Sequence, residues 1–298
     1  MSIAQVEKRG QRTAGGGIPR ELFGYEIIGV LGQGAGSTIY AASHPQTRQI
    51  CALKHVVVTH EKEQRFVDQL RAEYEVGRKV AHPGLRRSLD FKAKASWLGK
   101  VSEAALVMEL VDGVPLDQRI PDGLLALVDC FVQTAHALGA LNEMGYCHCD
   151  LKPGNILVGA DGATKVIDLG QACPHGTKKR RIQGTPDFIA PEQVRCEAVT
   201  PRTDVFNLGA TMYWCLSGEK LPTLFTAGKG QNSFVVDSYI RSPRDIRPDV
   251  PENLSNLVME CVRIKAEKRP ADMAEVARRL EVIQFALGRA AGRMAMAS

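Results

Sequence analysis

The hydrophobic pattern of the chain changes at Asp112-Gly113, and this change restricts the chain to folds built from two unlike parts. Before this point, short runs rich in Ile, Val, Leu and Tyr alternate with polar or Gly-rich turns and predict β-strands. The clearest runs are Tyr25–Leu31, Ser37–Ala42 and Gln49–Val58, and shorter ones lie around Leu89 and at 105–110. One helical stretch covers residues 63–80. The first part is therefore predicted to be an antiparallel, β-rich lobe with one main helix.

The second part of the chain reads as mostly helical, with Gly- and Pro-rich loops between the helices. Its helical stretches are Gly123–Met144, Asp204–Ser217, Glu252–Ile264 and Ala271–Leu287. We therefore predict an α+β fold with a small lobe at residues 21–111 and a larger helical lobe at 112–287. Residues 1–20 and 288–298 lack periodicity or end in Gly-rich sequence, and are predicted to be flexible tails.

Composition and charge exclude several classes of protein. The 298 residues include 44% hydrophobic and 24% charged residues, as in a soluble globular chain. The net charge of +5 is too small for the basic stripe of a nucleic-acid-binding protein. The most apolar stretch, 124–141, is interrupted by Asp129, Gln133 and His136 at helical spacing, which favours a half-buried helix over a membrane span. The first twenty residues lack the apolar core of a signal peptide, so we expect a cytoplasmic location.

The eight cysteines are scattered along the chain, and no CxxC occurs among them. In a chain of ordinary size with no secretion signal, this predicts reduced thiols rather than disulfides. Cys147-His148-Cys149 resembles a metal site, but successive positions of a strand point to opposite faces and no second ligand pair is near in sequence. We therefore expect no zinc there.

A glycine-rich turn, Gly32-Gln-Gly34-Ala-Gly36, joins the first two predicted strands. Glycines let backbone N–H groups approach a phosphate because no Cβ intervenes, but the same sequence also fits a simple hairpin turn. A dinucleotide-binding turn would lead into a helix, whereas Ile39 continues a strand, and the chain has no GxxxxGK[ST] loop. This turn alone leaves both interpretations open.

Lys54 lies among apolar neighbours on the third predicted strand, where a lysine is costly unless it meets a negative charge. Glu73, on the predicted helix, is an available partner. The alternative is that both are ordinary surface residues. Motifs further along the chain decide between these interpretations.

Three motifs follow in order: His148-Cys-Asp-Leu-Lys-Pro-Gly-Asn155, Val166-Ile-Asp-Leu-Gly170 and Gly184-Thr-Pro-Asp-Phe-Ile-Ala-Pro-Glu192. With these motifs the chain resembles the protein-kinase family, and in particular the bacterial serine/threonine kinases of eukaryotic type. The resemblance covers about residues 25–270. It implies the two-lobed protein-kinase fold and transfer of the γ-phosphate of Mg-ATP to a Ser or Thr hydroxyl of a protein.

The resemblance implies a role for each residue of the catalytic loop. Asp150 would accept the proton of the substrate hydroxyl, and Lys152 would neutralise the γ-phosphate. A lysine two residues after the catalytic aspartate is the serine/threonine-type pattern. Thr185 would hydrogen-bond to both Asp150 and Lys152.

The resemblance also implies how phosphates and magnesium are held. Lys54, oriented by Glu73, would contact the α- and β-phosphates, and Asn155 and Asp168 would hold the magnesium ions. The residues expected to bind the rest of the nucleotide are Leu31, Gly32, Gly34, Gly36, Ile39, Ala52, Glu109, Val111 and Leu157, with Met108 as gatekeeper. His148, Leu169 and Asp204 match positions with architectural roles, and Glu192 with Arg269 matches an ion pair that anchors the activation segment.

The main departure from the family is Cys149, because many kinases have arginine before the catalytic aspartate. That arginine normally pairs with a phosphorylated residue of the activation segment. The segment 168–192 contains two hydroxyl residues, Thr177 and Thr185. We therefore predict activity that does not depend on phosphorylation of this segment.

Two further departures concern the first lobe. Ser37 stands in place of the third glycine of the loop, with Gly36 beside it, so weaker or altered clamping of ATP is the most we expect. Gly77, four residues after Glu73, replaces a bulkier side chain that the family supplies to an apolar stack. This predicts a looser helix and a Lys54–Glu73 pair that is easily lost.

The densest basic run, Lys178-Lys-Arg-Arg181, lies in the activation segment. A run of charges is usually a solvated face, and the sharper hypothesis is that this one attracts an acidic substrate or partner. Cys149 and Cys173 lie near the predicted site, and we expect inert thiols there.

Two alternatives remain for the function. Small-molecule phosphotransferases of the aminoglycoside or choline kinase type share the His-x-Asp-x-x-x-x-Asn loop, but they lack Ala190-Pro191-Glu192 and usually Lys152. A pseudokinase scaffold would bind partners or nucleotide without transferring phosphate. Its mark is the loss of catalytic residues, whereas Lys54, Asp150 and Asp168 are all present.

Overall fold

The computed structural model describes residues 18–34, 36–95, 99–223, 225 and 240–297. Residues 1–17 of the predicted N-terminal tail lie outside this described part. The chain divides into two compact units, and each is considered by itself. The first unit comprises Met1–Ala81, Arg86–Gly113 and Asp168–Gly170, and the second comprises His82–Leu85, Val114–Ile167 and Gln171–Ser298.

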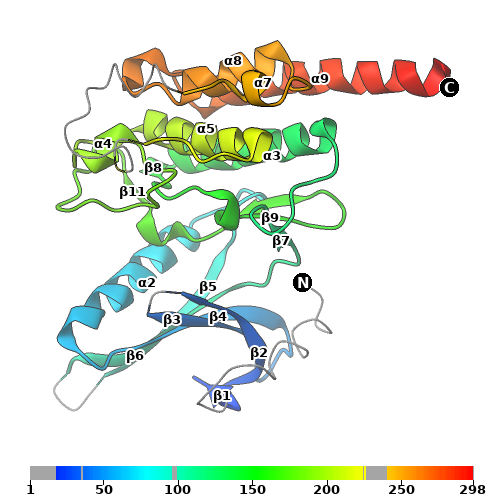
Figure 1. The fold of residues 1–298 in the computed structure, drawn as a ribbon. Coiled ribbons are helices and arrows are strands. Elements are labelled where there is room, and N and C mark those ends of the chain that lie inside the picture. The colour runs from blue at the N-terminus through cyan, green and yellow to red at the C-terminus, as the bar shows by residue number, and fades with distance from the viewer. Residues whose placement is uncertain (1–17, 35, 96–98, 224, 226–239, 298) are drawn as a thin grey trace. The chain divides into compact units, whose positions relative to one another are not determined.

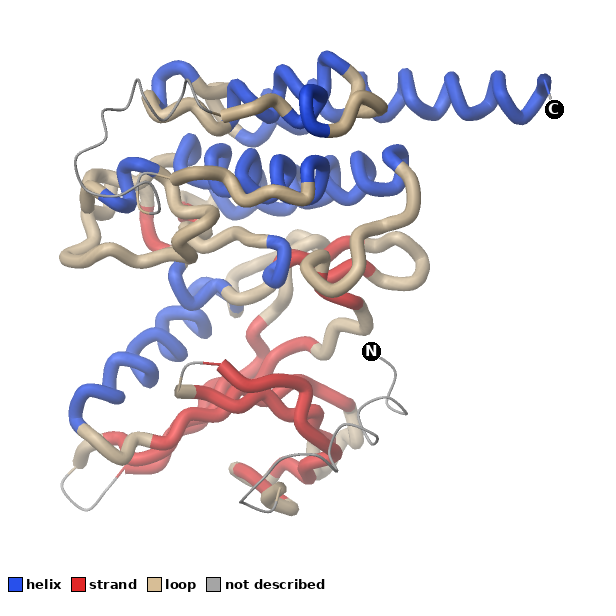
Figure 2. Tube along the Cα trace, in the orientation of Figure 1, coloured by secondary structure: helices blue, strands red, loops and turns tan. Residues whose placement is uncertain are grey.

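The first unit is built on one antiparallel sheet with the strand order β1-β2-β3-β4-β6-β5 (Figures 1 and 2). Its strands are β1 (Glu21–Leu22), β2 (Tyr25–Gly34), β3 (Ser37–Ser43), β4 (Ile50–Val57), β5 (Ser88–Ala95) and β6 (Val101–Glu109). Alternate residues of a strand point to opposite faces, so this sheet supports two separate hydrophobic clusters. Leu53 belongs to one cluster and its neighbour Ala52 to the other.

Helix α2 (Gln64–Gly77), preceded by the short turn η1 (Glu61–Glu63), packs against β5 and β6. Its buried side chains recur at helical spacing, and Glu73 is one of them, flanked by Leu70 and Val76. A carboxylate on this apolar stripe needs a cation, because burial of an unpaired charge is costly. The helix itself therefore directs Glu73 toward the sheet.

Gly77 has a packing role that the prediction of a looser helix did not include. A Cβ at this position would collide with Ser88 Oγ, so the glycine lets the end of α2 approach β5 closely. The Lys54–Glu73 pair is formed in the structure at 2.7 Å. The expectation of an easily lost pair is therefore not supported, because it treated Gly77 only as a weak helix former.

The second unit consists mainly of helices in layers, with α3 (Leu124–Glu143) and α5 (Pro201–Ser217) in one layer and α8 (Glu252–Cys261) and α9 (Met273–Ala297) in the next (Figure 1). Shorter helices are α4 (Pro191–Val194), α7 (Pro243–Ile246), η2 (Pro153–Asn155) and η4 (Ala266–Lys268), and η3 (Leu169–Gln171) begins in the first unit. The strands β7 (Val114–Pro115), β9 (Ile156–Val158) and β10 (Thr164–Val166) form a small sheet, and β8 (Tyr146–Cys147) pairs with β11 (Cys173–Pro174).

Among the described residues, one helix has the length and the apolar composition needed to cross a membrane, and this helix is α3. More than half of its most apolar window is buried inside the protein. Phe131, Leu138 and Leu141 are among its fully buried side chains, and α3 packs on α5 and α9. These contacts are those of a core helix.

The main predicted elements and the α+β class are confirmed, and the differences concern short elements and the end of one helix. The five short strands of the second unit were not predicted, because two or three residues are too few for a periodic signal. Helix α9 continues beyond Leu287, the predicted limit, to Ala297. Gly288 and Gly292 disfavour this extension, but the Ala, Arg and Met residues around them are good helix formers.

Candidate active site

Lys54 is a buried cation held by two carboxylates within the first unit. Its Nζ donates to Glu73 Oε2 at 2.7 Å and to Asp168 Oδ1 at 3.0 Å. The side chains of Lys54 and Glu73 are only 13% and 3% exposed. Burial alone would lower the pKa of Lys54, but the two carboxylates outweigh burial and raise that pKa above its ordinary value. Lys54 is therefore a fixed positive charge.

Arg86 supplies a second cation to Glu73, a contact that sequence patterns do not indicate. The Nη2 of Arg86 lies 3.4 Å from Glu73 Oε1, and the residue is buried. In sequence, Arg86-Arg87 reads as an exposed basic pair, and it is too far from Glu73 to show helical spacing. Lys54, Glu73, Arg86 and Asp168 are called the charged cluster below.

The residues predicted to contact adenine and the phosphates fall into two groups in the first unit. Leu31 and Ile39 pack against the hydrophobic cluster that contains Ala52 and Met108. Ala52 lies opposite Met108 across β4 and β6. One apolar face of the sheet thus collects the predicted adenine contacts of this unit, and Leu157 lies on β9 of the second unit.

The glycine-rich turn connects β2 and β3 as a hairpin within the sheet. Gly36 has a left-handed backbone, with φ of 82°, and a Cβ there would collide with the ring of Phe66 on α2. A Cβ at Gly32 would meet no atom within 4 Å, and one at Gly34 would meet only Ser37 Oγ at 3.4 Å, so both backbones are open to approach. Glu109 ends β6 with its N–H donated to Arg87 O at 3.0 Å, and Val111 follows two residues later.

The loop predicted to be catalytic lies in the second unit, where a carboxylate, an ammonium group and a hydroxyl group meet. Thr185 Oγ1 donates to Asp150 Oδ1 at 2.8 Å and accepts from Lys152 Nζ at 3.1 Å. Lys152 Nζ lies 3.8 Å from the other oxygen, Asp150 Oδ2. The hydrogen bonds predicted for Thr185 are therefore both formed. Thr185 thus binds only one carboxylate oxygen of Asp150, and Oδ2 receives no hydrogen bond from it.

A buried carboxylate holds the backbone of this loop. Asp204 accepts from the N–H groups of His148 and Cys149 at 2.9 and 3.0 Å, and from Asn142 Nδ2 at 2.9 Å. His148 Nδ1 accepts from Asp150 N at 3.3 Å, so its Nε2 carries the proton that is donated to Ile167 O at 3.2 Å. The architectural roles predicted for His148 and Asp204 thus correspond to main-chain hydrogen bonds.

The two predicted magnesium ligands have suitable donor chemistry. Asn155 Nδ2 donates to Asp150 O at 2.8 Å, which leaves its side-chain oxygen as the atom for a cation. Asp168 has a left-handed backbone, with φ of 63°, in the first unit. Oxygen donors of this kind suit Mg²⁺. In the described ranges, no group of three or more His, Cys, Asp or Glu side chains has the arrangement of a metal site.

The activation segment begins against a cluster of neutral thiols. Cys147, Cys149 and Cys173 pack together with Val199 and are called the thiol cluster below; the Sγ atoms of Cys149 and Cys173 are 3.7 Å apart. The contact of Cys149 with Cys147, together with burial, raises the pKa of the Cys149 thiol. A raised pKa favours the neutral thiol, and the inertness of Cys149 and Cys173 stays a prediction.

Side chains that the sequence did not single out complete the hold on this segment. Gln193 Nε2 donates to Cys149 O at 2.7 Å and to Gln183 O at 3.2 Å, and its oxygen accepts from Asn207 Nδ2 at 3.1 Å. Amides give no charge or periodicity signal, so sequence patterns do not reveal this contact. Gln193 thus ties the segment directly to the backbone next to Asp150.

The segment ends at the predicted ion pair, which is formed. Arg269 donates to both carboxylate oxygens of Glu192, at 2.8 and 3.0 Å, and also to the carbonyl oxygens of Arg202, Arg263 and Ile264. The side chain of Arg269 has no exposed surface and that of Glu192 is 10% exposed. Burial would raise the pKa of Glu192, but Arg269 holds it below its ordinary value.

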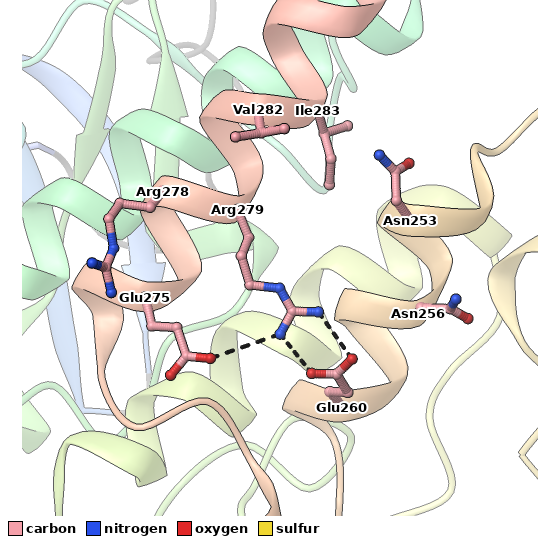
Figure 3. Close-up of a pocket in the computed structure, with 8 residues that line it drawn as sticks. All are labelled: Asn253, Asn256, Glu260, Glu275, Arg278, Arg279, Val282 and Ile283. Carbon is pink, nitrogen blue, oxygen red and sulfur yellow. Dashed lines mark hydrogen bonds and ion pairs between the residues drawn. The ribbon is translucent and has the colours of Figure 1, made fainter.

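A groove of about 730 Å³ lies elsewhere in the second unit, between α8 and α9 (Figure 3). Figure 3 shows Arg279 placed between Glu260 and Glu275, while Val282 and Ile283 form an apolar part of the lining. Arg279 Nη2 donates to Glu260 Oε1 at 2.9 Å. None of the predicted site residues lines this groove.

Known proteins are similar to this chain over most of its length. The family model of the protein kinase domain matches residues 25–280. Serine/threonine-protein kinase PknA of Mycobacterium tuberculosis is 30% identical over 83% of this chain and 57% of its own length. Serine/threonine-protein kinases drp72 of Corynebacterium efficiens is 28% identical over 89% of this chain and 52% of its own. The DNA damage-responsive serine/threonine-protein kinase RqkA of Deinococcus radiodurans is 27% identical over 85% and 38%, so this chain matches about half or less of these relatives.

Proposed function

The chain belongs to the protein kinase family, with its two-lobed fold, and on that premise we propose that it transfers the γ-phosphate of Mg-ATP to a Ser or Thr hydroxyl of a protein. The observation that carries this proposal is the arrangement of Asp150, Lys152 and Thr185, in which one hydroxyl joins the carboxylate to the ammonium group. A base and a cation fixed this way suit phosphoryl transfer, which depends on positioning and on neutralising charge.

Asp150 is the proposed base for the substrate hydroxyl. Thr185 holds one of its carboxylate oxygens and Asn155 holds its backbone carbonyl, while Oδ2 stays available to accept a proton. Lys152, at 3.8 Å from that oxygen, would stabilise the negative charge that develops on the transferred phosphoryl group. Lysine at this position also favours a protein hydroxyl of the serine/threonine type.

The charged cluster is the proposed site for the α- and β-phosphates. Lys54 is a permanent cation, and Glu73 with Arg86 restricts its position. Asn155 and Asp168 would hold Mg²⁺, which when bound supplies charge neutralisation for the phosphate oxygens. The glycine-rich turn would donate backbone N–H groups, and Leu31, Ile39, Ala52 and Leu157 would contact adenine, with the backbone of Glu109 and Val111 for its polar edge.

The substrate and location are part of the same proposal. The relatives named serine/threonine-protein kinase support a protein acceptor, and the small net charge does not suggest a nucleic-acid partner. We place the chain in the cytoplasm on the basis of its composition and of α3, which is buried as a core helix. No observation in the described residues favours the small-molecule phosphotransferase or the pseudokinase.

The test is phosphate transfer from Mg-ATP to a generic protein rich in Ser and Thr, with Asp150→Asn as the variant. Loss of a positioned general base is expected to lower kcat by about 10²–10⁴-fold while nucleotide binding is retained. Asp161→Asn, an exposed loop substitution in the same unit, is the matched control and should leave kcat unchanged. Nucleotide binding without transfer in the unmodified chain would instead identify a pseudokinase.

A further inference from the structure

The basic run of the activation segment is divided by the structure into used and unused cations. Lys179 Nζ donates to the main-chain oxygen of Gln171 at 2.7 Å and to its side-chain oxygen at 3.1 Å. Lys178 forms a bridge with Ala198 through its backbone only, and its exposed ammonium group makes no hydrogen bond or ion pair with another described residue. Arg180 and Arg181 are exposed, and neither makes a hydrogen bond or an ion pair with another described residue. Two guanidinium groups of this segment therefore have no internal role among the described residues.

The stretch of the segment around these arginines has no acidic side chain to neutralise them. Residues 171–185 contain four Lys or Arg and no Asp or Glu. The nearest carboxylate along the chain, Asp187, is already paired with Lys220 at 2.8 Å. Residues 171–185 thus concentrate positive charge, which attracts anionic ligands and raises their rate of association.

Between residues 171 and 185, the segment has no buried charge that requires an internal anion. Its start is held by the thiol cluster and by the pairing of β8 with β11, and Gln193 holds it further along. These contacts are neutral. Arg180 and Arg181 are therefore not needed to hold the segment in place, and they are available to a bound partner.

The position of these arginines relative to the catalytic loop defines which partner they would meet. Arg181 lies four residues before Thr185, whose hydroxyl donates to Asp150. A chain spans at most about 3.6 Å per residue, so the Cα atoms of Arg181 and Thr185 are within ~14 Å of each other. A substrate peptide in extended form advances about 3.3 Å per residue. Acidic residues within about four positions of the acceptor hydroxyl therefore come within reach of the arginines.

We propose that Arg180 and Arg181 select protein substrates that carry Asp or Glu within about four residues of the acceptor Ser or Thr. This inference rests on the proposed kinase function and adds a substrate class to it. Arginine suits the role because its guanidinium group can hydrogen-bond to a carboxylate through two N–H groups. Since both groups are exposed, the preference acts mainly on KM and weakens as salt rises.

The experiment uses two peptides with one central Thr, one with Glu at the four positions on either side and one with Gln there. The unmodified chain is expected to show a kcat/KM about fivefold higher for the Glu peptide at low salt, mostly through KM. In Arg180→Gln/Arg181→Gln this ratio should fall toward one. Arg278→Gln/Arg293→Gln, which removes the same charge from exposed positions on α9, should keep the ratio.

Charge reversal and binding distinguish this inference from the proposed function. Arg180→Glu/Arg181→Glu should prefer a peptide with Lys in place of Glu. Binding of a Glu peptide with Ala as acceptor, followed by fluorescence anisotropy, reports the preference without phosphate transfer. A preference in binding with no transfer to any peptide would overturn the proposed function alone. Equal ratios in the unmodified chain, or a ratio that survives Arg180→Gln/Arg181→Gln, would overturn the inference and leave the arginines as a solvated face.

Discussion

The charged cluster around Lys54 and the thiol cluster next to Asp150 are both largely buried, but opposite kinds of contact hold them. In the charged cluster, four ionisable side chains neutralise one another at 2.7–3.4 Å. In the thiol cluster, three neutral side chains pack together, and the position before the proposed base carries Cys149 where many kinases have arginine. Charge is present at the proposed phosphate contact and absent at the place where a phosphorylated segment would be bound.

The contrast suggests that charge serves the proposed phosphate transfer and does not serve regulation by phosphorylation. The proposed transfer needs a permanent cation near the phosphates, and Lys54 keeps its charge because two carboxylates raise its pKa. Binding of a phosphorylated segment needs a cation that this chain does not place before Asp150. The two regions should therefore respond differently when a charge is removed or added.

The largest expected effect tests whether the stability of the second unit depends on its buried ion pair, Arg269–Glu192. Arg269→Ala should lower the free energy of unfolding by about 3–5 kcal/mol, because it leaves Glu192 buried without its partner. Arg279→Ala is the matched control, since its pair with Glu260 is much more exposed, and it should cost about 1 kcal/mol or less. Urea denaturation of both variants measures the difference.

The same pair predicts a dependence on pH. Because Arg269 lowers the pKa of Glu192 in the folded state, this group stabilises the fold above its unfolded pKa of about 4.3. That contribution is lost as the pH falls through the lower, folded value. Glu192→Gln should therefore lack this part of the acid sensitivity, which urea denaturation at a series of pH values measures. If the difference in free energy of unfolding between Glu192→Gln and the unmodified chain stayed the same on acidification, the role given to the Glu192–Arg269 pair would be contradicted.

The next effect tests the charged cluster. Lys54→Met should lower kcat/KM by about 10²–10³-fold, because it removes a fixed charge aimed at the proposed phosphate contact. Lys62→Met, at an exposed lysine of η1 in the same unit, should have little effect. Steady-state phosphate transfer at varied ATP measures both. A loss below tenfold for Lys54→Met would mean that its charge is structural only.

The next prediction concerns the stability of the thiol cluster when Cys149 is replaced by the arginine that many kinases have at this position. Cys149→Arg places a larger side chain in a closely packed site, and we expect a loss of about 1–3 kcal/mol in the free energy of unfolding. Cys149→Ala, which adds no bulk, should cost about 1 kcal/mol. Thermal and urea unfolding compare the two. Equal stability of Cys149→Arg and the unmodified chain would show that the cluster accommodates a cation.

The smallest effect concerns phosphorylation of the activation segment. Thr177→Ala should change turnover by no more than about twofold, since the Thr177 hydroxyl donates to Pro174 O, outside the proposed site, and no arginine precedes Asp150 to receive a phosphate there. Phosphate transfer by this variant, and by the unmodified chain after phosphatase treatment, measures the effect. A large gain on phosphorylation of Thr177 would break the contrast between the two regions.

Much of the first unit follows from sequence, because its strands and helix carry clear periodic patterns. Tyr25–Gly34, Ser37–Ser43 and Gln64–Gly77 all lie close to their predicted ranges. The residues of the catalytic loop follow from the motifs, and the structure brings Asp150, Lys152 and Thr185 together. The strands, the helix and the motifs are local in sequence, which is why the sequence reveals them.

Contacts between distant residues account for what the sequence did not reveal. Arg86 meets Glu73, and Gln193 meets Cys149, without any spacing that would indicate it. The run 178–181 reads as a single solvated face, yet Lys179 bonds internally while Arg180 and Arg181 do not. In sequence, Gly77 is only a weak helix former, whereas in the structure the absence of a Cβ makes room for Ser88 of β5.

The carboxylate of Asp204 has a consequence for how this loop tolerates variation. It grips the main-chain N–H groups of His148 and Cys149, and the backbone of Cys149 is left-handed, with φ of 64°. The course of the chain into Asp150 is thus set by peptide groups that every amino acid except proline possesses. A substitution at 149 that fits the buried site and the left-handed backbone therefore leaves these hydrogen bonds intact, and the direction of Asp150 is kept.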